Sequence, residues 1–217
     1  DVLTALGVKI DATADVMADC LKSIGIAFLF AAVLHPAMKH AIGPRREIGI
    51  RSIFNILGPL SNPAGARYAV LGVYDRDLTV TLATAAAALG AKRLFVVHGL
   101  DGLDEITTTG PTRVAEVKDG KVTTYDIEPG GFGIPTATRK DLLGGDAAEN
   151  AGYVREVLSG KTGPRRDIVL LNAAAAIVAG QKAKDFKEGI AVAAHSIDSG
   201  AASEKLERLV AMTNKPS

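Results

Sequence analysis

Short apolar runs alternate along this chain with stretches in which apolar residues recur every three or four positions. Four of the runs have the β-branched and aromatic composition of buried strands, at residues 8–10, 26–30, 67–74 and 93–99. Between them, residues 11–25 and 77–90 carry apolar side chains at helical spacing. This alternation predicts an α/β domain with a mainly parallel sheet flanked by helices.

The pattern changes after residue 111. Residues 112–126 hold two alternating runs around Asp119 and Gly120, a pair that tolerates the positive φ angles of a tight hairpin turn. We therefore expect an antiparallel hairpin beside the parallel strands.

The last third of the chain is predicted to be helical. Asp146 and Glu149 have the spacing of a capping box, which marks the start of a helix. Pro164 is favourable at a first helical position, and the helix it opens is so apolar that we expect it to be buried against the sheet.

Residues 35–65 follow a different pattern, because Pro and Gly residues break the segment into short pieces. We interpret it as an excursion toward a second, small helical domain. The predicted division assigns residues 1–43 and 67–217 to the α/β domain and residues 44–66 to the helical one.

Composition narrows the possible functions. The 217 residues are 47% hydrophobic and 23% charged, and 25 Lys and Arg against 24 Asp and Glu leave a net charge of +1. This balance lacks the basic excess of a nucleic-acid binder, so a small-molecule partner is favoured. No apolar run approaches the roughly 20 residues of a membrane span. Cys20 is alone, so we expect an inert, buried thiol and a cytoplasmic protein.

Two carboxylates are the first candidates for chemistry. Asp104 and Glu105 follow the strand predicted at 93–99, and open α/β sheets bind ligands at the carboxyl ends of their strands. Paired oxygen donors of this kind suit Mg²⁺ bound to a substrate phosphate. On spacing alone, a solvated acidic loop is the favoured interpretation, because Asp and Glu are mostly exposed surface residues.

Arg45 and Arg46 are the second candidates. They are predicted to lie in the first turn of a short helix, where a cation is unfavourable for the helix dipole. One guanidinium could bind an anionic substrate through its planar fork, and the alternative is two solvated charges.

Other site types lack their motifs. His35, His40, His98 and His195 show no zinc-ligand spacing. The sequence also contains no phosphate-binding loop of the triphosphate or dinucleotide type and no serine-hydrolase elbow.

Four segments carry a family resemblance, at residues 28–64, 98–110, 144–151 and 169–177. The motifs GPRREIGIRSIFNILGPLSNPA and HGLDGLDEITTTG within them strongly resemble the anthranilate phosphoribosyltransferases of tryptophan biosynthesis. The resemblance implies a large α/β domain of the nucleoside phosphorylase and phosphoribosyltransferase type, a small helical domain and a homodimer.

The resemblance also implies a reaction and the residues that serve it. The family transfers a phosphoribosyl group from phosphoribosyl pyrophosphate to anthranilate, with release of pyrophosphate and with Mg²⁺ as cofactor. By resemblance, Arg45 holds the anthranilate carboxylate, Gly58 and Pro59 line the acceptor tunnel, and Asp104 and Glu105 bind magnesium.

The departures from the family are also informative. The glycine-rich G-T-G-G-D and K-H-G-N segments, which cradle the donor phosphates, do not occur in the sequence, and its opening residues are similar to the stretch that follows them. We therefore expect a carboxy-terminal fragment that is inactive alone. Alternatives are a pyrimidine-nucleoside phosphorylase relative, a non-catalytic nucleic-acid-binding relative and an interaction domain.

Overall fold

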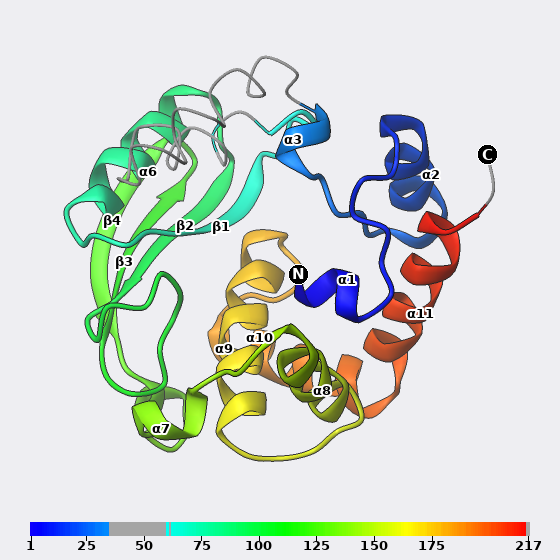
Figure 1. Ribbon diagram of the computed structural model, residues 1–217. Helices are drawn as coiled ribbons and strands as arrows, with labels where there is room; N and C mark the ends of the chain where they lie inside the picture. The colour runs from blue at the N-terminus through cyan, green and yellow to red at the C-terminus, as the bar shows by residue number, and fades with distance from the viewer. Residues whose placement is uncertain (35–59, 61, 216–217) are drawn as a thin grey trace, which may run out of the picture. The chain divides into compact units, whose positions relative to one another are not determined.

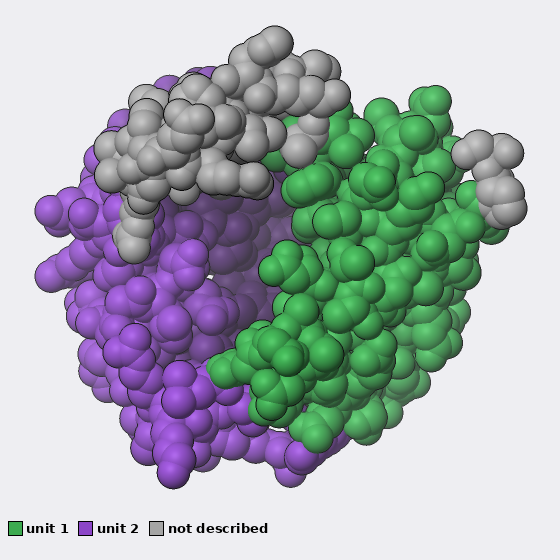
Figure 2. Space-filling view, in the orientation of Figure 1, with its two compact units in different colours: residues 1–55, 144–159, 197–217 green, residues 56–143, 160–196 purple. Residues whose placement is uncertain are grey.

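The computed structural model describes residues 1–34, 60 and 62–215 and divides the chain into two compact units (Figure 2). Unit 1 comprises residues 1–55, 144–159 and 197–217, and unit 2 comprises residues 56–143 and 160–196. Figure 1 labels the elements of both units.

Unit 2 is built on a four-stranded sheet with the order β1-β2-β3-β4 (Figure 1). The strands are β1 (Tyr68–Gly72), β2 (Arg93–Gly99), β3 (Thr112–Lys118) and β4 (Lys121–Ile127). The first two strands pair in parallel, and the other two pairings are antiparallel. The mixed α/β sheet flanked by helices confirms the predicted fold class. The expectation of a mainly parallel sheet is wrong for the described strands, because β3 returns antiparallel beside β2 and only one of the three pairings is parallel.

Both faces of β2 are buried because a helix covers each side of the sheet. Phe95 and Val97 pack into a core with Leu171 of α9 (Pro164–Ala179). The alternate residues of the strand, including Val96, pack against α6 (Leu78–Ala88) on the other face. This double coverage explains why the strand is an unbroken apolar run.

The remaining helices of unit 2 are short or follow α9 in the chain. They are the 3₁₀ helix η2 (Pro129–Phe132), α7 (Arg139–Leu142) and most of α10 (Phe186–Asp198). The backbones of α9 and α10 approach closely, since a Cβ added to Gly189 would lie 3.0 Å from the Cα of Ala174. Small residues at this crossing allow the two helices to pack.

Unit 1 is helical in its described residues. Its helices are α1 (Val2–Ala5), α2 (Ala14–Ile24), α3 (Ala31–Leu34), α8 (Ala147–Leu158) and α11 (Ala201–Thr213). Val8, Cys20, Ile24 and Leu209 form its buried core. Cys20 is fully buried, as predicted, and burial raises the pKa of its thiol, with the nearby charge of Asp19 adding to the effect.

Local signals in the sequence are confirmed at several element ends. Asp146 accepts hydrogen bonds from the backbone of Ala148 and Glu149, and the Glu149 carboxylate accepts one from the Asp146 amide, which completes the capping box of α8. At the hairpin, Asp119 and Gly120 have φ angles of 51° and 77°, as the tight turn requires.

The predictions of strands at residues 8–10 and 26–30 are wrong. Neither segment forms a strand in the described part of the chain, and Ile10 lies in a turn. Val8 is buried in a core made by helices, and the amide of Lys9 donates to the Thr213 hydroxyl instead of to a neighbouring strand. Apolar composition predicted the burial of Val8 but not the pairing, because a strand also needs a partner edge. In residues 26–30 the burial was wrong as well, since Ile26 is exposed and the other four residues are half-buried.

No helix among residues 1–34, 60 and 62–215 combines the length and the apolar character needed to cross a membrane.

Candidate functional site

The candidate site is the acidic loop, residues 100–111, which joins β2 to β3. Asp104 and Glu105 are exposed in it, beyond the carboxyl end of β2. The loop also passes the end of the parallel strand β1, because a Cβ added to Gly72 would lie 1.6 Å from the carbonyl oxygen of Asp104. The structure therefore places the carboxylate pair beyond the carboxyl end of β2, as the sequence predicted, and also beside the end of the parallel strand β1, which it did not predict.

Asp101 organises the first half of the acidic loop. One of its carboxylate oxygens accepts hydrogen bonds from the hydroxyls of Thr107, at 2.7 Å, and Thr109. The other oxygen accepts one from the amide of Leu103 at 3.2 Å. Burial by itself would raise the pKa of Asp101. The hydrogen bonds to its carboxylate outweigh this effect and hold the pKa below its ordinary value.

The second half of the acidic loop is anchored in the core. Ile106, Thr107 and Thr108 are fully buried, although Glu105 beside them is exposed. The amide of Thr107 donates to the Thr112 hydroxyl at 3.0 Å, which ties the loop to the first residue of β3. The backbone that follows the exposed carboxylates is thus anchored in the core.

The electrostatics of the pair suit a cation. Glu105 keeps contact with solvent, but the protein packed around its carboxyl group partly desolvates it and raises its pKa above the ordinary value, and the neighbouring negative charges of Asp104 and Asp101 raise it further. A divalent cation would relieve this repulsion, so the residues present fit Mg²⁺. Mg²⁺ in proteins is commonly held by one or two carboxylates, with water and substrate phosphate completing its coordination.

In the part of the chain that the structure describes, no third His, Cys, Asp or Glu side chain joins this pair in a possible metal site. Within residues 1–34, 60 and 62–215, no group of three or more His, Cys, Asp and Glu side chains could hold a metal ion. His98, near the loop in sequence, is largely buried, and its Nδ1 donates to the carbonyl oxygen of Val73 at 2.8 Å. This bond links the ends of β2 and β1 and gives the imidazole a structural role.

The predicted acceptor-site residues Arg45, Gly58 and Pro59 lie outside the described residues, as do Arg46 and His35. Their roles stay predictions.

Three contributors to the acidic loop were not among the predicted site residues, namely Asp101, Gly72 and Asn172. Asp101 was hidden within a motif whose other acidic residues drew attention, and Gly72 ends an ordinary apolar strand. Asn172 is a polar residue within the apolar run of α9, which is a signal that it satisfies a buried backbone group.

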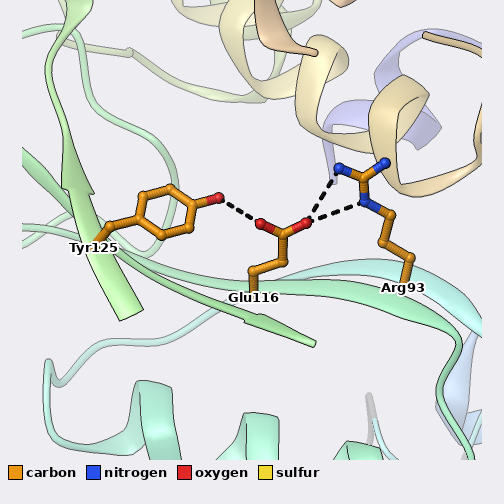
Figure 3. Close-up of polar contacts among 3 residues, drawn as sticks. All are labelled: Arg93, Glu116 and Tyr125. Carbon is orange, nitrogen blue, oxygen red and sulfur yellow. Dashed lines mark hydrogen bonds and ion pairs between the residues drawn. The ribbon is translucent and has the colours of Figure 1, made fainter. Parts of the chain in front are cut away.

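A second polar cluster lies on the sheet at the amino end of β2, away from the acidic loop (Figure 3). Both oxygens of Glu116 are used: one contacts the Arg93 guanidinium at 3.1 Å and the other accepts a hydrogen bond from Tyr125 at 2.9 Å. Burial raises the pKa of Tyr125, and the charge of Glu116 adds to that effect. The three side chains come from three strands, so the cluster joins β2, β3 and β4.

The helix-flanked mixed sheet, with its acidic loop at the strand ends, places the protein among α/β domains of the phosphoribosyltransferase and nucleoside phosphorylase type. The model of a glycosyl transferase family, a/b domain, matches residues 1–203. The chain belongs to this family.

Highly similar relatives of the chain are anthranilate phosphoribosyltransferases. The chain is 60% identical over 99% of its length to an anthranilate phosphoribosyltransferase of Citrifermentans bemidjiense and 56% identical to that of Geobacter sulfurreducens. It spans 61% of the length of each of these relatives.

Solved structures give the same family. The crystal structure of anthranilate phosphoribosyltransferase from Thermus thermophilus matches with a TM-score of 0.92 and 42% identity, over 99% of this chain and 64% of that one. The Saccharomyces cerevisiae enzyme in complex with PRPP and Mg matches with a TM-score of 0.89 and 32% identity, over 98% of this chain and 62% of that one.

Proposed function

We propose that this chain is the larger part of an anthranilate phosphoribosyltransferase of tryptophan biosynthesis. The complete enzyme transfers the phosphoribosyl group of phosphoribosyl pyrophosphate to the amino nitrogen of anthranilate and releases pyrophosphate. The observation that carries the proposal is the anchored carboxylate pair at the strand ends of a chain that is 60% identical to such a transferase over 99% of its length.

Asp104 and Glu105 bind the magnesium ion of this reaction. When bound, Mg²⁺ neutralises charge on the pyrophosphate leaving group and orients the donor. The complex of the yeast relative with PRPP and Mg supports this role. The contribution of the chain is a pair of carboxylates held on fixed backbone, so that little reorganisation is needed when the metal and donor arrive.

The acceptor is held by another part of the chain. Arg45 binds the anthranilate carboxylate through its guanidinium fork, and Gly58 and Pro59 shape a flat slot for the ring. The yeast relative in complex with 4-fluoroanthranilate supports a site of this chemistry. Residues 44–66 belong to a small helical domain, and residues 1–43 and 67–217 to the α/β domain.

Further parts of the proposal concern the complete protein. It is a cytoplasmic homodimer that binds no nucleic acid. The present chain has no turnover by itself, because the glycine-rich segments that cradle the donor phosphates in the family are not in its sequence.

Fluorescence of anthranilate tests the proposal, because the signal is lost as the substrate is consumed in the presence of phosphoribosyl pyrophosphate and Mg²⁺. We expect turnover from a protein extended to the length of its relatives and none from residues 1–217. In the extended protein, Asp104→Asn and Glu105→Gln should each raise the half-saturating Mg²⁺ concentration by more than about tenfold.

Three results would contradict parts of the proposal. An extended protein that leaves anthranilate fluorescence unchanged would refute the activity. An unaltered Mg²⁺ dependence in both carboxylate variants would refute the metal assignment. Turnover by residues 1–217 alone would show that the donor phosphates bind within this chain.

A further inference from the structure

Asn172, on α9, makes a two-way contact with the acidic loop. Its side-chain oxygen accepts a hydrogen bond from the amide of Ile106 at 2.9 Å, and its side-chain nitrogen donates to the carbonyl oxygen of the same residue at 2.8 Å. The nitrogen also donates to the carbonyl oxygen of Ile168 at 3.0 Å, one turn earlier in the helix. The amide group of Asn172 therefore pairs with Ile106 as a neighbouring strand would.

The position of Ile106 makes this contact relevant to the carboxylates. Its amide nitrogen belongs to the peptide group that links it to Glu105, so Asn172 fixes that peptide plane. The Ile106 side chain is fully buried in the core that contains Leu171, the residue beside Asn172. The backbone that follows the carboxylate pair is thereby fixed to α9.

The carboxylate pair is confined from the other direction as well. The Asp104 carbonyl oxygen lies against Gly72, where there is no room for a Cβ. Within the loop itself, the Asp101 carboxylate accepts hydrogen bonds from the hydroxyls of Thr107 and Thr109. The constraints from Gly72 and Asn172 act on the two peptide groups that flank Glu105, and Asn172 is 66 positions away from Ile106 in the sequence.

We propose that Asn172 is a positioning residue for the metal site, and that it sets the affinity of Asp104 and Glu105 for a divalent cation by holding the Ile106 backbone. This inference rests on the proposed function of the carboxylate pair. It adds to that function a residue of α9 that touches neither metal nor substrate.

The matched control is Asn150, on α8. Its side chain makes the same two-way contact with Gly145, accepting from the amide and donating to the carbonyl oxygen, both at 3.0 Å. Asn150→Ala and Asn172→Ala therefore remove the same chemical groups from two places in the chain. Only Asn172→Ala removes hydrogen bonds to the backbone beside Asp104 and Glu105.

The experiment is an NMR titration of the full 217-residue chain with Mn²⁺. Binding is measured as the paramagnetic broadening of the backbone amide signals of Asp104, Glu105 and Ile106. We expect Asn172→Ala to raise the half-saturating Mn²⁺ concentration about tenfold, the lower end of the usual effect of residues that orient metal ligands. Asn150→Ala should leave it unchanged. In the metal-free protein, Asn172→Ala should also speed hydrogen exchange at the Ile106 amide.

Asn172→Asp is the second variant, in case Asn172→Ala does not fold. It keeps the size of the side chain and the acceptor for the Ile106 amide, but it places an anionic oxygen against the Ile106 carbonyl. We expect a similar rise in the half-saturating Mn²⁺ concentration. A folded Asn172 variant with the affinity of the unaltered chain would overturn the inference.

The carboxylate variants separate this outcome from failure of the proposed function. Asp104→Asn and Glu105→Gln should abolish the broadening at Glu105 and Ile106. If they abolish it and the Asn172 variants bind Mn²⁺ normally, the positioning role is wrong and the metal site stands. If broadening persists in both carboxylate variants, the metal assignment fails, and the inference fails with it.

Discussion

Asp101 shows how one exposed side chain can organise a functional loop. Its two oxygens accept hydrogen bonds from Thr107, Thr109 and the amide of Leu103, so the carboxylate replaces a regular backbone ladder over several residues. Its ionised form is favoured by these donors, which makes the loop sensitive to acid.

Asp101→Asn should lower the melting temperature at neutral pH, because an amide accepts the three donors less well than a carboxylate. The pKa of Asp101 is depressed in the folded state, so its stabilising contribution is present above the ordinary value of 3.8 and is lost as the pH falls through the folded-state pKa. Thermal unfolding across the acid range should therefore show the two proteins converging as the pH falls below the folded-state pKa of Asp101.

Asp119→Asn is the control for this series, since the hairpin turn accepts Asn as readily as Asp. Its melting temperature should follow that of the unaltered chain at every pH. A difference between Asp101→Asn and the unaltered chain that persists at low pH would contradict the role of the charge.

Gly72→Ala should distort the acidic loop, because the new Cβ would lie 1.6 Å from the Asp104 carbonyl oxygen, far inside van der Waals contact. We expect a loss of about 1–3 kcal/mol in the free energy of unfolding, measured with denaturant. Gly131→Ala is the control, because an added Cβ there meets nothing within 4 Å. Equal stability of the two variants would count against the close approach of strand and loop.

At the scale of an element, α8 begins with a complete capping box. Asp146→Ala removes the acceptor of two backbone amides and should cost about 1 kcal/mol of stability. Glu149→Gln should cost less, because glutamine can still accept from the Asp146 amide. Urea unfolding of both variants gives the comparison, and a Glu149→Gln variant that is the less stable of the two would show that the charge of Glu149 matters more than the cap.

The cluster of Arg93, Glu116 and Tyr125 joins three strands, and its members should be energetically coupled (Figure 3). Tyr125→Phe should cost about 1.5 kcal/mol, as expected for a hydrogen bond to a charged group. Glu116→Gln should cost about 2 kcal/mol, because the partly buried Arg93 loses its charged partner.

The double variant completes a cycle for this cluster. Since the hydroxyl of Tyr125 contacts the carboxylate that the second substitution changes, we expect a coupling energy of about 1 kcal/mol. Strictly additive losses in chemical denaturation would show that Tyr125 and Glu116 are not coupled.

At the scale of the whole molecule, the proposed function places the anthranilate-binding residues and the metal-binding residues in different segments of the chain. In a protein extended to the length of its relatives, Arg45→Ala should raise the anthranilate KM far more than the KM for phosphoribosyl pyrophosphate, because the carboxylate loses its guanidinium partner. Steady-state kinetics with each substrate varied in turn give the comparison. Equal increases would contradict the role of Arg45, and Arg46→Ala serves as the neighbouring control.

The sequence by itself determined those features that depend on neighbouring residues. Helix ends are decided by capping side chains within a few positions, so the start of α8 at Asp146 and the hairpin turn at Asp119 and Gly120 were predicted correctly. The doubly buried strand β2 was also predicted, because burial on both faces leaves an unbroken apolar run. The carboxylate pair followed from its place after that strand.

Only the tertiary structure decided which distant groups meet. Residues 8–10 have the composition of a strand, yet Val8 packs among helices. Among the described residues, no strand pairs with the backbone of this segment. Gly72 limits the path of the acidic loop through a contact that no local pattern encodes. Asn172 reaches Ile106 from a helix far along the chain, because the packing of α9 on the sheet brings one polar side chain to an unpaired stretch of backbone, and hydrogen-bond satisfaction there depends on position in space.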